Sequence, residues 1–112
     1  MPDIHKKGWG YENWLVNNEL YCGKILHFEL GSKCSLHYHK IKDETFYVLN
    51  GTINLYIVDS IKNISKHLLS KGDSYHILPG VAHAVEALVE SDIIEISTQH
   101  FEDDSYRIIK GD

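Results

Sequence analysis

The stretch from Gly31 to Gly51, GSKCSLHYHKIKDETFYVLNG, most strongly constrains how this chain can fold. In a β-strand, residues two apart point to the same face, so His37 and His39 are expected to project together. The five-residue step to Glu44 is long enough for a tight turn, which would bring the carboxylate back on the next strand. Two imidazoles and one carboxylate that converge form a ligand set for a divalent transition metal.

The alternative is that these polar side chains lie on a solvated strand face. Apolar residues are interleaved with them, however, namely Leu36, Phe46 and Val48. The segment is therefore expected to be at least half buried. Burying an imidazole or a carboxylate without a partner would cost roughly 1–3 kcal/mol each. A bound metal removes this cost, so the sequence favours a metal site.

A second segment with the same logic runs from Gly72 to His83. A turn glycine leads into a short strand, Pro79-Gly80 reverses the chain, and His83 opens a strand whose alternate residues are small and apolar. A lone histidine in such a position is more often a satisfied core residue than a ligand. Because the upstream ligand set still lacks a member, we interpret His83 as a fourth ligand.

Turn residues divide the chain into short segments rich in β-branched and aromatic residues. We expect residues 1–10 to form an N-terminal arm and residues 11–112 to form a single domain. No window shows an apolar stripe with the 3.6-residue period of a helix, so the pattern predicts an all-β antiparallel sandwich or barrel. A polar loop is expected at 59–65, and the expected strands are 11–16, 21–30, 44–49, 52–59, 67–69, 74–78, 83–89, 92–98 and 106–109.

Charge and composition exclude several classes of partner. The 112 residues carry a formal net charge of −5 and scattered lysines, whereas nucleic-acid binding usually needs a concentrated basic face. No run approaches the roughly 18 apolar residues of a membrane span, and the first residues lack the apolar core of a signal peptide. Cys22 and Cys34 are expected to be reduced and buried, although a disulfide between neighbouring strands stays open. These features predict a cytoplasmic protein.

The two histidine-bearing segments resemble the two motifs of the cupin superfamily. The first is similar to G-(x)5-H-x-H-(x)3,4-E-(x)6-G and fills every defined position, with Gly31, His37, His39, Glu44 and Gly51. The second is similar to G-(x)5-P-x-G-(x)2-H-(x)3-N. Its matches are Gly72, Gly80 and His83, and its departures are Leu78 for proline and Ala87 for asparagine. Neither departure falls on a ligand.

This resemblance implies a double-stranded β-helix, which is a small jelly-roll barrel, with a metal inside. Carried over position by position, the ligands would be His37, His39, Glu44 and His83. Three neutral nitrogens and one carboxylate suit Mn, Fe, Co, Ni or Zn, and the sequence does not rank these metals. Four ligands on an octahedral ion leave two adjacent positions, where a substrate can chelate through two oxygens.

The ends of the chain resemble a narrower group, the sugar-phosphate isomerase cupins and especially the type II mannose-6-phosphate isomerase domains. Gly8 to Glu12 is similar to their PWGxYE opening, and Glu95 to Arg107 is similar to their closing IEVQxG…EDDIxR segment. His37 departs from this group, where many members carry glutamine. The resemblance implies aldose–ketose isomerisation, in which a metal polarises the carbonyl and a general base moves a proton by way of an enediolate.

The sequence leaves the general base open. The candidates are His76, Glu95, Lys24 and Tyr38. Glu95 and Lys24 equally suit a solvated strand face, and His76 suits an outward position. The parity of residues 92–98 does not decide, because both alternate sets contain plausible inward residues.

Candidate substrate contacts come from the two ends of the chain. Arg107 is a candidate for holding a sugar phosphate, although a surface ion pair with Glu102 or Asp103 is the commoner role. Trp9 and Trp14 are candidates for stacking on a sugar ring, but aromatic residues near a terminal strand more often fill a core or a dimer interface.

Three functions stay open. The first is a metal-dependent isomerase of a sugar or sugar phosphate, and the second is a non-catalytic cupin that binds a sugar or another small ligand through its metal. The third is an iron-dependent oxygenase, which uses the same ligand set. The ends of the chain favour the first over the third, while the unidentified base keeps the second open. We also expect a homodimer that associates through edge strands and the N-terminal arm, with a carbohydrate as the small-molecule partner.

Overall fold

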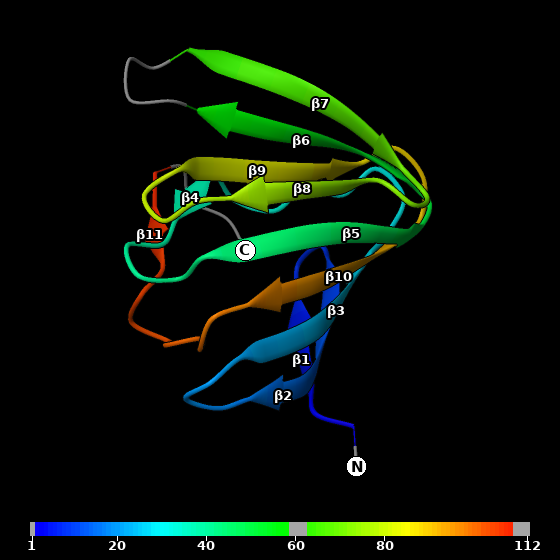
Figure 1. Ribbon diagram of the computed structural model, residues 1–112. Helices are drawn as coiled ribbons and strands as arrows, with labels where there is room; N and C mark the ends of the chain where they lie inside the picture. The colour runs from blue at the N-terminus through cyan, green and yellow to red at the C-terminus, as the bar shows by residue number, and fades with distance from the viewer. Residues whose placement is uncertain (1, 59–62, 109–112) are drawn as a thin grey trace.

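The computed structural model describes residues 2–58 and 63–108, and within them all regular structure is β (Figure 1). Sheet A has the order β1-β2-β3-β10-β5-β8. Its strands are β1 (Ile4–Lys7), β2 (Gly10–Asn17), β3 (Cys22–Phe28), β5 (Glu44–Asn50), β8 (Ser74–Ile77) and β10 (Ser91–Ser97). Sheet B has the order β11-β4-β9-β6-β7. Its strands are β4 (His37–Tyr38), β6 (Thr52–Val58), β7 (Ile64–Ser70), β9 (Ala82–Ala87) and β11 (Tyr106–Arg107).

The two sheets face each other and enclose the interior, with every strand pair antiparallel (Figure 1). This confirms the predicted all-β class. Within the described residues, no helix has the length and apolar character needed to cross a bilayer.

Two segments that the sequence assigned to irregular structure form strands. Residues 4–7, expected as part of an arm, pair with β2 from Ile4↔Asn13 to Lys7↔Gly10 and form one edge of sheet A. The expected loop at 59–65 ends earlier, because Ile64 and Ser65 already belong to β7 and continue its pairing with β6. The rest of that expected loop, residues 59–62, lies outside the described residues, as do residues 109–112 beyond β11.

Alternating side chains of the two sheets form a common core. On β3 the buried residues are two apart, from Cys22 to Phe28, as the alternation in the sequence predicts. Trp9 is 4% exposed and stacks on Phe28, with 4.1 Å between ring centres. Trp9 therefore fills the core. The fully buried apolar residues at the centre are Val48, Ile53, Leu55, Ala87 and Ile93.

Asn50-Gly51, a dipeptide typical of hairpin turns, joins β5 to β6, but it leads from one sheet to the other, so these two strands do not form a hairpin. Gly51 has a φ of +90°, a region that favours glycine. A Cβ at this position would also collide with the side chain of Ser91, which donates to the Val89 carbonyl and accepts from the N–H of Thr52. The turn thus depends on glycine for both its conformation and its packing.

Candidate metal centre

The interior contains a cavity of about 200 Å³ between the two sheets. Residues that the sequence placed far apart line it together, because β3, β5 and β10 of sheet A face β4 and β9 of sheet B. The buried polar side chains that line it include those of His39, His83, Lys24, Lys42 and Glu95.

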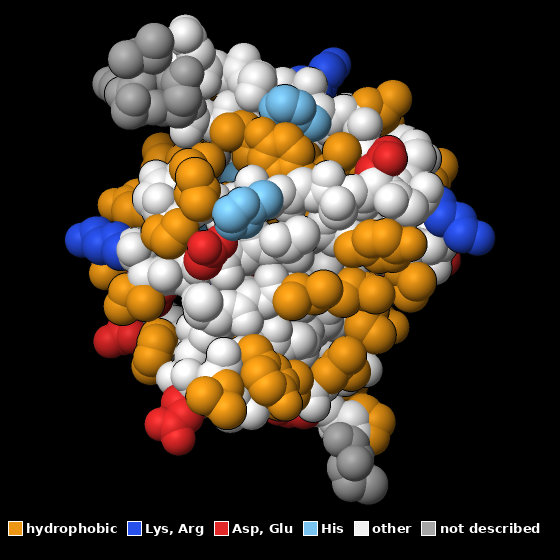
Figure 2. Space-filling model, in the orientation of Figure 1, with side chains coloured by type: hydrophobic (Ala, Val, Ile, Leu, Met, Phe, Trp, Pro, Cys, Tyr) orange, Lys and Arg blue, Asp and Glu red, His pale blue; other side chains and the backbone are white. Residues whose placement is uncertain are grey.

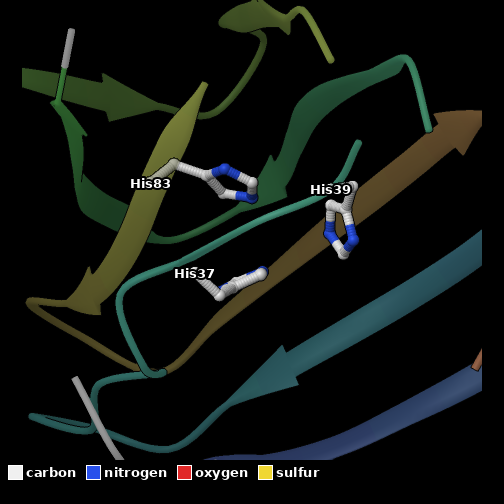
Figure 3. Close-up of side chains that lie close together, drawn as sticks. All are labelled: His37, His39 and His83. Carbon is white, nitrogen blue, oxygen red and sulfur yellow. The ribbon is translucent and has the colours of Figure 1, made fainter. Parts of the chain in front are cut away.

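Three of the histidines that line this cavity point their rings toward one another (Figure 3). His37 on β4 lies directly opposite His83 on β9 in the antiparallel register, and His39 follows two residues later. One ring nitrogen from each histidine lies within 4.8 Å of the others. The structure thus brings together the three histidines that the two motifs contain.

The backbone fixes the protonation of all three rings. Each Nδ1 is hydrogen-bonded to a backbone carbonyl, which can only accept, so each Nδ1 must carry the proton. The acceptors are Ser35 for His37 (2.8 Å), Asp104 for His39 (2.7 Å) and Val81 for His83 (3.0 Å). Each neutral ring therefore keeps its lone pair on Nε2, and this arrangement is typical of metal-binding histidines.

Glu44 opens β5 and is 2% exposed, and it lies beside these rings. Its Oε2 is 3.5 Å from His39 Nε2 and 3.4 Å from His83 Nε2, which is longer than the usual charge-assisted hydrogen bond of about 2.7–2.9 Å. Within the described residues, Glu44 Oε2 and His83 Nε2 are buried without a hydrogen-bond partner. A cation between these atoms would satisfy both of them.

The pKa shifts of the three histidines and Glu44 also favour a bound cation. Burial, foremost, lowers the pKa of His37, His39 and His83 from 6.5 to about 4, so all three are neutral near pH 7 and free to coordinate. Burial also raises the pKa of Glu44, and the charge of Glu95 adds to this rise. A bound cation would offset the cost of ionising Glu44. The donor set therefore fits a divalent transition metal.

A buried ion pair lies beside the four residues, and the sequence analysis did not foresee one of its members. Lys42 Nζ donates to Glu95 Oε2 at 3.0 Å, and Ser97 Oγ donates to the same oxygen at 3.1 Å. Burial alone would raise the pKa of Glu95, but Lys42 and then Lys24 hold it below its usual value. Glu95 is thus an ionised carboxylate on the cavity wall.

The structure separates the four candidates for the general base. On β10 the side chains of Ile93, Glu95 and Ser97 point inward. The sequence alone left open which of the two alternating sets of residues 92–98 faces the interior. Glu95 and Lys24 line the cavity, whereas His76 is exposed and bonded to Asp43, and Tyr38 stacks on Tyr106 at 5.2 Å. Neither His76 nor Tyr38 lines the cavity, so neither reaches a ligand held there.

Arg107 on β11 also lines the cavity, where its strand pairs with β4. Within the described residues, Arg107 forms no ion pair with Glu102 or Asp103, the surface role that the sequence suggested as commoner. Arg107 is exposed, so it lies on the solvent side of the cavity lining.

Asp104 is a further residue that the sequence reasoning missed. Its carboxylate accepts the backbone N–H groups of Lys40, Ile41 and Lys42 at 2.9–3.2 Å, while its carbonyl accepts the proton of His39 Nδ1. The acidic run at residues 102–104 is a weak signal for this role, because such a run is equally typical of a solvated loop.

Both cysteines are free, Cys22 buried and Cys34 half-buried. The disulfide that stayed open in the sequence analysis is therefore not formed. Burial raises the pKa of Cys34 to about 11, so this thiol stays protonated at neutral pH.

Comparison with known proteins identifies the family of this chain and similar folds among solved structures. A family model described as Cupin domain matches residues 24–96. Oxalate decarboxylase from Bacillus subtilis has a TM-score of 0.86 at 19% identity over 96% of this chain, and CapF from Staphylococcus aureus has 0.84 at 18% over 98%. KdgF from Halomonas sp. has 0.78 at 19% over 90%. No curated protein sequence matches the chain.

The chain spans 30% of the oxalate decarboxylase chain and 33% of the CapF chain, but 89% of the KdgF chain. At these identities the likeness shows the fold, and it confirms the predicted jelly-roll barrel. The narrower resemblance to sugar-phosphate isomerases stays a prediction, because the family match is to the cupin domain as a whole.

Proposed function

The chain belongs to the cupin family, and on that premise we propose that it is a metal-dependent enzyme that isomerises a sugar or sugar phosphate by an aldose–ketose conversion. The observation that carries the metal part of this proposal is the pair of orphaned buried atoms, Glu44 Oε2 and His83 Nε2. Two such atoms 3.4 Å apart would be costly in a folded protein unless a ligand joins them.

We propose His37, His39, Glu44 and His83 as the residues that hold the ion. When bound, a divalent metal would polarise a carbonyl and thereby acidify the neighbouring C–H bond. Mn, Fe, Co, Ni and Zn all suit this donor set. Manganese has particular support, because the B. subtilis oxalate decarboxylase is described as having Mn(II) centres.

Of the two base candidates in the cavity, Glu95 suits the role better. Its carboxylate is ionised and can accept a proton, whereas the ammonium of Lys24 lies over the ring of Trp14 and has no lone pair to offer. Glu95 faces the cavity from β10 beside Glu44, which is opposite Ser97 in the register. A base in this position would move a proton between adjacent carbons of a substrate held at the metal centre.

A second candidate function is metal-dependent binding without catalysis. The observation that favours it is the strength of the Lys42–Glu95 ion pair, which holds the pKa of Glu95 below its usual value and makes it a weak base. CapF is described as a capsular polysaccharide assembling protein, which supports a carbohydrate ligand under either function. An iron-dependent oxygenase stays a third alternative that the donor set permits.

We further propose that the protein is a homodimer. Figure 2 shows apolar side chains gathered on the outer face of sheet A, over β5 and β10. The outward side chains there include Tyr47, Leu49 and Ile96, which are 37%, 41% and 58% exposed. Strand β1 forms an edge of the same sheet that no other strand of the described residues covers. Sedimentation of a monomer at tens of micromolar protein would contradict the proposal.

The test of the enzymatic proposal is solvent deuterium uptake observed by NMR. The protein, loaded in turn with Mn, Zn, Ni and Fe, is incubated in heavy water with aldoses and aldose phosphates. We expect metal-dependent deuterium at C2 that is lost in His83→Ala and strongly slowed in Glu95→Gln. A metal-loaded protein that exchanges no proton on any of these sugars would contradict catalysis and favour the binding function.

A further inference from the structure

Two buried lysines line the cavity beside the metal centre, Lys24 and Lys42, and Lys42 is the more firmly held of the two. Its ammonium lies 3.0 Å from Glu95 Oε2, 3.2 Å from His100 Nδ1 and 3.8 Å from Glu44 Oε1. Two of its three N–H donors thus have hydrogen-bond partners, and the carboxylate of Glu44 lies within ion-pair distance. Lys42 is therefore part of the cavity wall.

Lys24 is buried but less well paired than Lys42. It is 1% exposed, yet its Nζ lies 3.4 Å from its one carboxylate partner within the described residues, Glu12 Oε1. That distance exceeds the usual about 2.7–2.9 Å of a charge-assisted hydrogen bond. The same Glu12 oxygen already accepts the indole N–H of Trp14 at 2.8 Å. The ion pair of Lys24 with Glu12 is therefore long, and Lys24 shares its acceptor oxygen with Trp14.

The rest of the surroundings of Lys24 do not complete its hydrogen bonding. The ring of Trp14 lies under the ammonium at 4.1 Å, where it attracts the charge but accepts no ordinary hydrogen bond. Glu95 is opposite Lys24 in the strand register, but its Oε2 is occupied by Lys42 and Ser97. A buried ammonium with open donors is costly unless a bound group supplies acceptors.

Lys24 also belongs to the same space as the metal centre. The cavity of about 200 Å³ is lined by Lys24 and Trp14 as well as by the three histidines. The charge of Lys24 acts on both carboxyl groups of that region, since it contributes to lowering the pKa of Glu44 and of Glu95. One small molecule can therefore contact the ammonium and the metal centre together.

We propose that Lys24 binds the anionic group, a carboxylate or a phosphate, of a small hydroxylated ligand whose remaining oxygens reach the metal centre. The volume limits this ligand to about the size of a monosaccharide, because pockets for drug-sized molecules are about 300–1,000 Å³. The assignment rests on the proposed function for the metal centre, and it specifies that the substrate is an anionic sugar, either a sugar acid or a sugar phosphate.

Glu12 is the group that opposes this assignment, since its carboxylate would repel an incoming anion and compete for Lys24. A change at Glu12 should therefore raise the affinity for anions, whereas changes at Lys24 should lower it. Glu12→Gln keeps an oxygen that can accept the indole N–H of Trp14 while removing the competing charge, so it is expected to strengthen anion binding.

The test is calorimetric titration of the zinc-loaded protein with D-glucose, D-glucuronate and D-glucose 6-phosphate. A metal attracts anions by itself, so the evidence lies in the variants rather than in the preference of the wild type. Lys24→Gln and Lys24→Met are expected to weaken binding of at least one anionic sugar by about tenfold or more. Their affinity for glucose and their zinc content are expected to stay at the wild-type level.

Lys33→Gln is the matched control, because Lys33 lies on the exterior, 65% exposed, paired with Glu86. It should bind all three sugars like the wild type. The glucuronate and glucose 6-phosphate titrations distinguish a carboxylate from a phosphate ligand.

Equal behaviour of the wild type and both folded Lys24 variants toward the two anions, including no binding by any of them, would overturn the proposal. If neither Lys24 variant folds, unchanged anion affinity in Glu12→Gln would overturn it as well. These outcomes differ from a failure of the proposed function, which would show as absent zinc or as absent deuterium exchange in the wild type.

Discussion

The backbone carbonyl of Asp104 accepts the Nδ1–H of His39 at 2.7 Å, while the carboxylate of Asp104 accepts three successive N–H groups of residues 40–42. One residue therefore orients a histidine of the candidate metal centre and also holds the turn that leads to Glu44. Because Asp104 comes from the segment between β10 and β11, this segment is a structural part of the centre.

We expect Asp104→Ala to weaken metal binding by about 10- to 100-fold, the usual effect of removing a group that orients a metal ligand. The physical reason is that the turn at residues 40–42 loses three hydrogen bonds, which lets His39 and Glu44 move apart. Competition with a chromophoric chelator measures the affinity. Asp103→Ala, at the exposed neighbouring position, is the control and should leave the affinity unchanged.

Removing a proposed ligand should have a larger effect. We expect His39→Ala, Glu44→Ala and His83→Ala each to lower the metal that is retained after dialysis by about tenfold or more, as measured by inductively coupled plasma mass spectrometry. His76→Ala is the matched control, since His76 bonds to Asp43 outside the cavity. Wild-type metal content in Glu44→Ala and His83→Ala would contradict the assignment.

Metal binding should also stabilise the fold, because the orphaned atoms of Glu44 and His83 gain a partner only in the loaded protein. A ligand at 1,000 times its dissociation constant adds about 4 kcal/mol to the free energy of unfolding. Urea unfolding with and without a chelator measures this gain. It should be absent in Glu44→Ala, and an equal gain in that variant would show that the metal binds elsewhere.

The buried Lys42–Glu95 ion pair should behave as a unit. Glu95→Gln or Lys42→Met alone leaves one buried charge unpaired, at an expected cost of about 3–5 kcal/mol. The double variant removes both charges and should be less destabilised than the sum of the two single variants. A double-mutant cycle from urea unfolding of the metal-free proteins measures the coupling, and strict additivity would contradict it.

A pH dependence follows from His27, on the outer side of β3. Burial alone would lower the pKa of His27, but the hydrogen bond to Asp92 at 2.7 Å and the charges of Asp92, Glu90 and Glu29 raise it above its usual 6.5. The folded state therefore holds the proton more tightly than the unfolded state. The resulting stabilisation is fully present below pH 6.5 and is lost as the pH rises through the folded-state pKa.

Accordingly, the difference in unfolding free energy between the wild type and His27→Gln should be largest near about pH 6 and shrink toward about pH 9. Urea unfolding across this range measures it. Asp92→Asn should show the same trend because it removes the main partner of His27. A difference that grows with pH would contradict the assignment.

Much of the fold could be predicted because strand alternation and turn residues are local signals. The alternation of residues 22–28 gave the correct inward face. Asn50-Gly51 is a turn but not the hairpin that this dipeptide predicts, because β5 and β6 belong to different sheets. The strand at residues 4–7 was missed because His5, Lys6 and Lys7 have no apolar alternation. They form a strand through pairing with β2, which is a tertiary effect.

The convergence of the three histidines and Glu44 could be anticipated from spacing, because the period of a strand and the length of a turn limit where those side chains can lie. Lys42, His100 and Asp104 could not be found this way. Their roles depend on contacts between residues 53 to 64 positions apart in the sequence, and no local pattern encodes such contacts. For the same reason the parity of β10 could be settled only by its neighbours.

The candidate centre takes side chains from both layers of the barrel: His37 and His83 lie on strands of sheet B, and Glu44 lies on a strand of sheet A. An ion held by these residues is a cross-link between the two layers, comparable in its effect to a disulfide. Loss of the ion would allow the layers to separate at that end first, so amide hydrogens of β4 and β5 would become exchangeable together. The metal centre would then also be the point that controls local opening of the barrel.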